Sequence, residues 1–176
     1  MKIAVVNWEI RQITEPKQFF AHLEEVVLRA APADLIVLPE LFILELCALR
    51  PDLQGPPMVP WLADHEPHFT DRLQRLAQEV KTTLVGGSVF ARREDQIVHV
   101  CQVVTPSGHV TEQPKNVLTQ FELVDWGLAP ATGLARQQDP ELGVLVCYDS
   151  EFPLGARTLA ESGVLVMAVP AYTETE

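Results

Sequence analysis

The sequence predicts an α/β protein whose sheet is covered by helices. Residues 3–6 (IAVV) and 35–38 (LIVL) are apolar at every position, as expected for strands that are buried on both faces. Between them, residues 16–30 carry apolar side chains at helical spacing, so the chain opens with a strand, a helix and a strand. The length of 176 residues predicts one domain, residues 1–176, with a sizeable core.

The first half of the chain continues this alternation. Pro16 suits the first turn of the first helix, and the second strand stops at Pro39-Glu40. Residues 41–49 are apolar and predict a short helix or a packed loop, while the proline-rich residues 51–60 predict a surface loop. A second amphipathic helix is expected from Pro67, with Phe69, Leu73, Leu76, Ala77 and Val80 on its apolar face.

The second half predicts more strands and one more helix. Residues 82–91 form a strand in which Gly86-Gly87 implies a bulge or a close approach to the backbone. Residues 96–105 and the return that starts at 109–111 form a hairpin. Residues 112–133 predict an irregular loop, and a loop of this length in a compact domain is often functional.

The last predicted elements are two strands with a helix between them. The strands span residues 142–146 and 164–169, and the helix spans residues 153–162 with Gly163 at its C-terminus. The fold-level alternative is a dinucleotide-binding domain of the Rossmann type, but no GxGxxG follows the first strand.

Net charge and cysteine content argue against several classes of partner and site. The net charge of −11 argues against nucleic acid or an anionic membrane as a partner, since both bind clustered Lys and Arg. Three scattered cysteines show neither zinc-ligand spacing nor a disulfide framework, and we expect no metal and no cofactor. The N-terminus does not resemble a signal peptide, so a cytoplasmic location is expected.

Cys147 stands where a predicted buried strand ends and a helix is about to start. A thiol at such a turn faces backbone N–H groups and the positive end of the helix dipole, which favour the thiolate and make a good nucleophile. The alternative is that Cys147, like Cys47 and Cys101, is simply a small buried hydrophobic residue.

Two further polar residues are candidates for the same site. Glu40 follows the strand at 35–38, and the carboxyl ends of strands in an open α/β sheet share one rim, so Glu40 and Cys147 are expected to converge. Lys115 lies between them in the chain, within the long loop. The alternatives are a helix-capping carboxylate for Glu40 and an exposed loop lysine for Lys115.

Three segments resemble the signature blocks of the carbon–nitrogen hydrolase family, also called the nitrilase superfamily. They are LPELF (38–42), PKNVLTQFELVDWGLAPATG (114–133) and CYDSEFPLGARTLAESG (147–163), in the family's order. The resemblance covers essentially the whole chain and implies a four-layer αββα sandwich of the nitrilase type. By this resemblance Glu40 matches the general base, Lys115 the catalytic lysine and Cys147 the nucleophile.

The resemblance also implies a substrate-binding set. Glu122 looks like the second active-site glutamate of many members, and Tyr148 and Asp149 match the motif around the nucleophile. Trp126 is expected either to line the pocket or to pack in the loop. Arg157 is expected to pair with a carboxylate and brace the turn.

The chemistry that follows is cleavage of a non-peptide C–N bond. Glu40 would deprotonate Cys147, which attacks the substrate carbon, and Lys115 with the backbone N–H after Cys147 would stabilise the negative charge. A thioester forms, ammonia or an amine leaves, and water completes the hydrolysis. We expect Lys115→Ala to abolish turnover while leaving the fold intact.

The sequence around the nucleophile favours one class of substrate. Cys147-Tyr148-Asp149 resembles the amidase and N-carbamoyl hydrolase branches rather than the Cys-Trp-Glu common in nitrile hydrolysers. The expected partner is therefore a small amide or N-carbamoyl compound. The alternatives are an acyltransferase that uses the same thioester and a non-catalytic association domain.

Two expectations concern the size of the protein and its assembly. Family members are usually longer, so the resemblance implies that this chain lacks the C-terminal part of the sandwich. It also implies a homo-oligomer.

Overall fold

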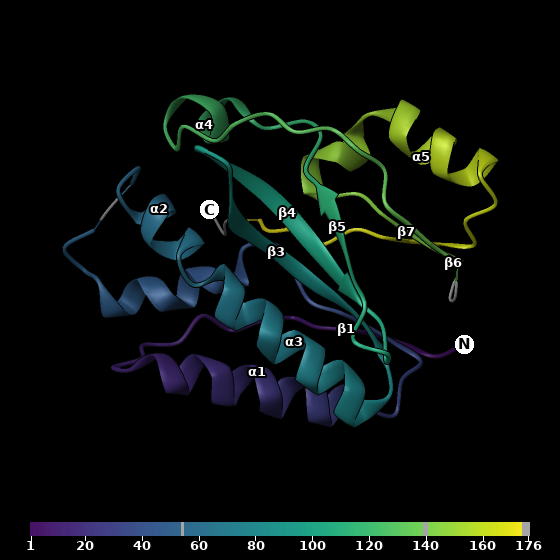
Figure 1. Ribbon diagram of the computed structural model, residues 1–176, viewed down its shortest axis with the longest axis horizontal. Helices are drawn as coiled ribbons and strands as arrows, with labels where there is room; N and C mark the ends of the chain where they lie inside the picture. Colours follow the sequence, from purple (N-terminus) through teal and green to yellow (C-terminus); the bar gives the residue numbers. More distant parts are fainter. Residues whose placement is uncertain (54, 139–140, 174–176) are drawn as a thin grey trace.

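The computed structural model describes residues 1–53, 55–138 and 141–173, and it contains two β-sheets (Figure 1). The strands of the larger sheet follow each other in chain order: β1 (Ile3–Val5), β2 (Leu35–Val37), β3 (Thr83–Arg93), β4 (Gln96–Val104) and β5 (Val110–Pro114). The first three are parallel, and β4 and β5 add antiparallel pairs, which confirms the predicted hairpin.

The smaller sheet packs face to face on the larger one. It contains β6 (Arg136–Gln138), β7 (Glu141–Val144) and β8 (Val166–Ala168). Their contact is a buried cluster that joins Leu35, Val37, Val85, Cys101 and Val103 to Leu142, Val144, Val146 and Ala168. The two last predicted strands are thus confirmed, and β6 is an additional strand that the sequence pattern did not predict.

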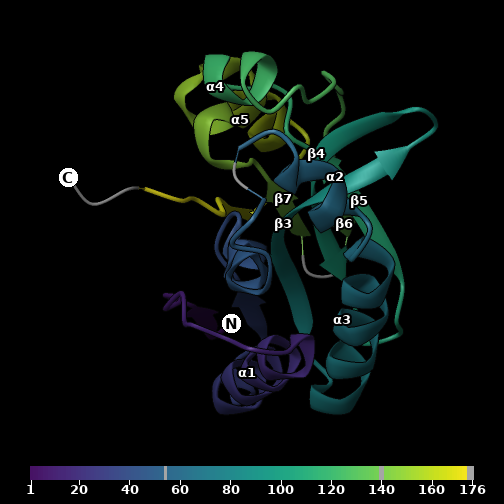
Figure 2. The same ribbon diagram turned by 90° about the vertical axis from the view of Figure 1, so that its left-hand side faces the viewer.

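Helices cover the outer faces of both sheets. α1 (Pro16–Ala30) and α3 (Glu66–Val80) bury their apolar stripes against the larger sheet, while α5 (Pro153–Glu161) lies on the opposite side of the molecule (Figures 1 and 2). Leu159 of α5 packs directly on Gly143, where a Cβ atom would collide with it. The order helix, sheet, sheet, helix confirms the predicted four-layer sandwich.

Short helices occupy two of the predicted loops. The 3₁₀ helix η1 (Phe42–Leu49) forms the packed segment after β2, and α2 (Met58–Ala63) begins inside the proline-rich segment that was expected to be loop throughout. The segment expected to be irregular from residue 112 begins as the end of β5 and contains α4 (Gln120–Val124). Among the helices in the described ranges, none is both long and apolar enough to cross a membrane.

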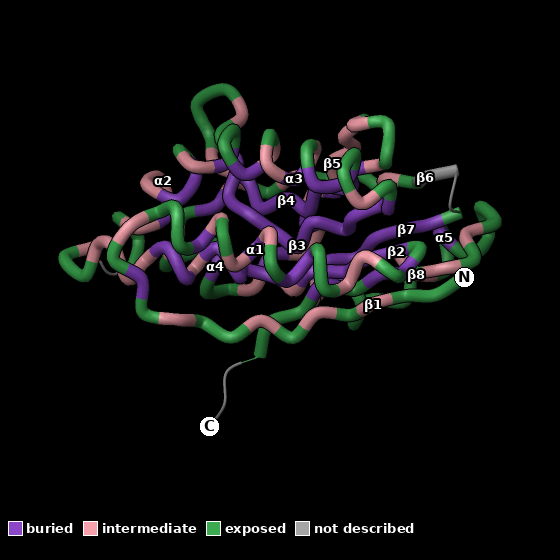
Figure 3. Tube along the Cα trace, turned by 90° about the horizontal axis from the view of Figure 1, so that it is seen from below, coloured by how far each residue is buried: buried purple, intermediate pink, exposed green. Residues whose placement is uncertain are grey.

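The prediction that the first strand is buried is wrong. β1 is the outermost strand of its sheet and is coloured exposed and intermediate in Figure 3. Val5 is 80% exposed. Apolar composition indicates a strand, but burial depends on neighbours that the strand's own sequence does not contain. β8, at the edge of the smaller sheet, likewise exposes Met167.

The glycine pair in β3 produces both predicted effects. The register between β3 and β4 shifts between Val85 and Ser88, which is a β-bulge. Gly87 has φ +66°, and a Cβ atom there would collide with the carbonyl oxygen of Pro39 and the ring of Phe42. Because Pro39 precedes Glu40, this close approach helps to define where Glu40 lies.

Candidate active site

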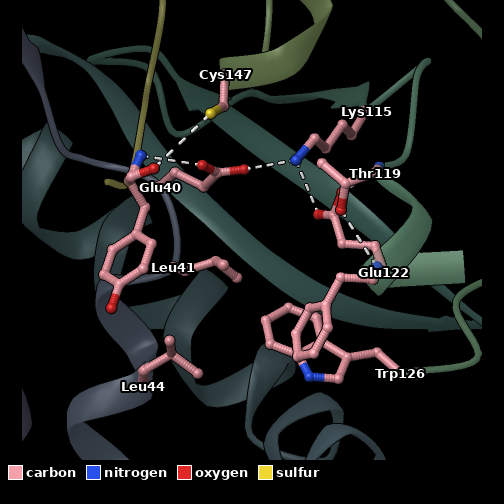
Figure 4. Close-up of a pocket in the computed structure, with 10 residues that line it drawn as sticks. Glu40, Leu41, Leu44, Lys115, Thr119, Glu122, Trp126 and Cys147 are labelled. Carbon is pink, nitrogen blue, oxygen red and sulfur yellow. Dashed lines mark hydrogen bonds and ion pairs between the residues drawn. The ribbon is translucent and has the colours of Figure 1, made fainter. Parts of the chain in front are cut away.

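Glu40, Lys115 and Cys147 line one pocket, although they come from distant parts of the chain (Figure 4). Glu40 follows β2 and precedes Leu41, which has a left-handed backbone with φ 54°. Lys115 directly follows β5, and its backbone N–H donates to the carbonyl of His99 at 2.9 Å. Cys147 follows β7 and opens the 3₁₀ helix η2 (Cys147–Glu151). The structure therefore brings together the three residues that the sequence singled out.

The ammonium of Lys115 lies between two carboxylates. Its Nζ donates to Glu40 Oε1 at 2.9 Å and to Glu122 Oε1 at 2.8 Å, and all three side chains are at most 4% exposed. Burial alone would lower the pKa of Lys115, but the charges and hydrogen bonds of Glu40 and Glu122 outweigh it and raise the pKa. Lys115 is therefore a buried, protonated cation, not an exposed loop lysine.

The hydrogen bonds at the start of α4 both position Glu122 and favour its ionised form. Thr119 caps α4, and its backbone N–H and hydroxyl donate to Glu122 Oε2 at 2.8 and 3.0 Å. The other oxygen, Oε1, receives Lys115 and lies 2.8 Å from His99 Nδ1. Burial alone would raise the pKa of Glu122, but His99, Lys115 and Thr119 together lower it to about 2.

Cys147 is held by backbone contacts rather than by a helix terminus. Its N–H donates to the carbonyl of Pro170 at 2.8 Å, its φ is 45°, and its Sγ lies 3.9 Å from the carbonyl oxygen of Tyr172. The backbone N–H of Tyr172 in turn donates to Glu40 Oε2 at 3.0 Å. Residues 170–172 thus connect the thiol to the carboxylate.

The expectation of a thiolate at Cys147 is wrong. Burial raises the pKa of Cys147, and the hydrogen bond and negative charge of Glu40 raise it further, outweighing the opposite effects of Tyr172 and Lys115. The expected helix dipole is weak at this position because η2 is a short 3₁₀ helix and α5 begins only at Pro153. The resting group is a thiol with a carboxylate base beside it.

Comparison with known proteins gives the family. The family model for carbon-nitrogen hydrolase matches residues 2–175. The chain belongs to the carbon–nitrogen hydrolase family. A curated relative, the probable hydrolase YhcX of Bacillus subtilis, is 29% identical over 183 residues, which cover 99% of this chain and 35% of YhcX.

Solved structures of this family share the fold. A carbon-nitrogen hydrolase from Helicobacter pylori superimposes with a TM-score of 0.79 at 20% identity, over 99% of this chain and 61% of that one. An amidase from Nesterenkonia sp. gives 0.76 at 23% identity, over 100% of this chain and 66% of that one. The sandwich is therefore of the nitrilase type, and the chain spans about a third to two-thirds of the length of these proteins.

The remaining predicted site residues divide into two groups. Glu122 and Trp126 line the pocket with Thr119, Leu41, Leu44, Phe121 and Tyr172. Tyr148 and Asp149 are not among the lining residues. Tyr148 packs edge-on against Phe152 at a ring separation of 5.1 Å.

Asp149 links the backbone of two segments of the site. Its carboxylate accepts the N–H groups of Val117 and Val146, at 2.7 and 3.1 Å. It therefore ties the segment after Lys115 to the strand before Cys147. Arg157, expected to brace this turn, instead pairs with Glu161 one turn further along α5.

Sequence reasoning missed several contributors: Tyr172, His99 and Ser88, and the lining residues Leu41, Leu44, Thr119 and Phe121. His99 and Gln102 are the polar residues of the segment Val98 to Val104, and a polar side chain inside a buried strand needs a partner, which is the signal that could have found His99. Ser88, a polar residue inside the buried strand β3, carries the same signal, whereas Tyr172 carries none.

Glu40, His99 and Glu122 also offer three possible metal-ligand atoms within 4.8 Å of one another. The Lys115 ammonium already contacts both carboxylates. A metal cation among these groups would lie against it, and the repulsion disfavours binding.

Proposed function

We propose that this chain carries the active site of a cysteine-dependent hydrolase that cleaves the C–N bond of a small amide through a thioester. The observation that carries this proposal is the pocket in which Cys147 lies beside the carboxylate of Glu40, with the Lys115 ammonium hydrogen-bonded to that carboxylate. Acyl transfer from an amide uses a nucleophile, a base and a hydrogen-bond donor for the oxyanion, and Cys147, Glu40 and Lys115 can supply these three groups.

The first step is attack of the thiol on the amide carbon. Glu40 takes the thiol proton as the S–C bond forms, and the carbonyl π electrons move to oxygen. Lys115 and the backbone N–H of Tyr148 donate to this oxygen, and each such donor contributes about 3–4 kcal/mol to catalysis. As Glu40 becomes neutral, Glu122 remains the ionised partner that keeps Lys115 in place.

The second step breaks the C–N bond and regenerates the enzyme. Glu40 returns its proton to the departing nitrogen, ammonia leaves, and the acyl group remains on Cys147 as a thioester. Water then attacks the thioester with Glu40 as the base again, releasing a carboxylic acid and restoring the thiol.

The pocket favours a neutral, apolar amide over an N-carbamoyl amino acid. Its volume is about 220 Å³, below the roughly 300–1,000 Å³ of pockets for drug-sized ligands. Leu41, Leu44, Phe121 and Trp126 form apolar walls, and Lys115 is the one cation among the described lining residues. A substrate carboxylate would be a third anion beside Glu40 and Glu122, which already outnumber the single ammonium, so repulsion disfavours it. Structures of the related Nesterenkonia amidase include a complex with butyramide, a neutral amide of this kind.

Ammonia release tests the proposal. The purified chain is incubated with acetamide, butyramide, an N-carbamoyl amino acid and butyronitrile, with Cys147→Ala as the control. We expect ammonia from butyramide, none from the Cys147→Ala variant, and much less from the N-carbamoyl amino acid. Product analysis with and without added methylamine separates hydrolysis from acyl transfer, because a hydrolase would still release mainly the carboxylic acid and a transferase mainly the N-methylamide.

Failure of the proposal has a defined signature. It would be no ammonia from any compound, together with alkylation of Cys147 that is no faster than alkylation of Cys47, whose pKa burial raises to about 11. That outcome would favour the association domain. The expected homo-oligomer stays a prediction, which size-exclusion chromatography with light scattering can test.

A further inference from the structure

A histidine outside the pocket lining extends the hydrogen bonds of the active site into the sheet. His99 lies on β4 and is 1% exposed. Its Nδ1 is 2.8 Å from Glu122 Oε1, and its Nε2 is 2.7 Å from the hydroxyl oxygen of Ser88 on β3. Both ring nitrogens of this buried side chain are therefore used.

Ser88 links His99 to the backbone next to Glu40, the proposed catalytic base. Its hydroxyl oxygen accepts the backbone N–H of Leu41 at 3.2 Å, and Leu41 follows Glu40 in the chain. Since Lys115 bonds to both glutamates, these contacts close a ring that passes through Glu40, Lys115, Glu122, His99, Ser88 and Leu41.

The β-bulge sets the geometry of this ring. The register shift before Ser88 coincides with Gly87, where the backbone of β3 approaches Pro39 too closely for any side chain. The ring thus spans β3, β4, α4 and the segments after β2 and β5. A misplaced member on any of these would displace the others.

We propose that His99 is a positioning residue for the catalytic set. It holds Glu122 through one ring nitrogen and, through Ser88, the turn that carries Glu40. The Lys115 ammonium is thereby kept in one position between the two carboxylates. The consequence for catalysis rests on the proposed function, but the effect on the resting Cys147 thiol does not.

The hydrogen bond between the Ser88 hydroxyl and His99 does not depend on which ring nitrogen of His99 carries the hydrogen. A hydroxyl can donate to a neutral ring nitrogen or accept from a protonated one, while the Nδ1–H donates to Glu122 in both states. The described charges nearby are two carboxylates and one ammonium. Phe90, whose ring centre is 5.4 Å away, supplies packing only.

The test compares His99→Phe with a matched variant on the same strand. Phenylalanine keeps the aromatic shape and removes both hydrogen bonds. Gln102→Leu is the control, because Gln102 is also buried on β4, bonds to Glu66 at 2.6 Å and Thr70 at 2.9 Å, and takes no part in the ring. His99→Gln serves as the conservative variant that can restore part of the effect.

Three readouts separate positioning from packing. They are kcat and KM for butyramide, the pH profile of kcat/KM, and the rate of Cys147 alkylation by iodoacetamide, followed by mass spectrometry. For His99→Phe we expect kcat to fall about 10- to 100-fold with little change in KM, a shifted pH profile, and slower alkylation. For Gln102→Leu we expect reduced stability, with all three readouts close to those of the unmodified chain.

Each outcome decides the proposal. Unchanged kcat, pH profile and alkylation in His99→Phe would overturn it, and so would equal losses in Gln102→Leu. If the unmodified chain hydrolyses no amide, the proposed function fails, while slower alkylation of Cys147 in His99→Phe still supports positioning. If His99→Phe does not fold, Ser88→Ala breaks the ring at another point. We expect it to slow alkylation, and an unchanged rate there would overturn the proposal.

Discussion

Replacing Lys115 by methionine tests the buried charge arrangement most directly. The substitution removes hydrogen bonds of 2.9 and 2.8 Å and leaves Glu40 and Glu122 facing each other without a cation. Removing one partner of a buried ion pair costs about 3–5 kcal/mol, against a total free energy of unfolding of about 5–15 kcal/mol. Loss of Lys115 is therefore expected to lower the free energy of unfolding substantially, and the expectation that the fold stays intact remains a prediction.

The pH dependence of this cost has a definite sign. In Lys115→Met, repulsion between the two carboxylates raises the pKa of one of them above its value in the unfolded chain. Stability of the variant should therefore increase as the pH falls, since protonation relieves the repulsion. The deficit relative to the unmodified chain is expected to be larger at pH 8 than at pH 5.

Urea unfolding followed by tryptophan fluorescence measures the effect. Lys17→Met is the matched control, because Lys17 pairs with Glu15 at the same 2.9 Å distance but is 77% exposed. Such surface pairs contribute about 0–1 kcal/mol. In a Glu122→Gln background, Lys115→Met should cost less, because only one buried carboxylate then loses its partner.

One result would refute this reasoning. If Lys115→Met is no less stable than Lys17→Met, and Glu122→Gln does not change its cost, Lys115 is not the buried counter-ion that the structure describes. Turnover provides a separate readout: it should fall by about 100-fold or more if Lys115 stabilises the oxyanion.

Three further predictions concern the framework of the site. The pKa of Glu122 is lowered from 4.5 to about 2, so the stabilisation by its carboxylate should be present above pH 4.5 and be lost as the pH falls toward 2. Urea unfolding across this range should show a loss of about 3 kcal/mol in the free energy of unfolding, and this loss should be absent in Glu122→Gln. Gly87→Ala should destabilise the chain by more than Gly55→Ala in thermal unfolding, because both have φ +66° and only Gly87 adds a collision with the Pro39 carbonyl to the strain of about 1–2 kcal/mol. Asp149→Ala leaves two backbone N–H groups without their acceptor, at about 1–3 kcal/mol each, and should lower kcat in steady-state assays more than it raises KM.

Much of the scaffold follows from local sequence. The apolar segments at residues 35–38 and 142–146 and the periodic apolar faces of α1 and α3 predict a sheet covered by helices, because each pattern depends on neighbours only a few positions away. The second sheet, and with it the four layers, was implied only by the family resemblance. The same patterns place Glu40 and Cys147 after buried strands, and the two residues do converge. The expected reason, one shared rim, is wrong: β2 and β7 belong to different sheets, and the residues meet because the two sheets pack face to face. The pattern of β1 was misleading, because apolar residues indicate a strand but do not say which strands will lie beside it.

The protonation states, by contrast, depend on contacts between remote residues. Glu40 and Lys115 are 75 positions apart, and Glu122 and His99 are 23 apart. From its local position Cys147 was expected to be a thiolate, but Glu40 and burial raise its pKa. The sequence by itself determined the layered fold and the candidate residues that follow its strands. Only the tertiary structure decided which of them are charged and what holds them in place, because electrostatic energies depend on distances in space and on burial rather than on separation along the chain.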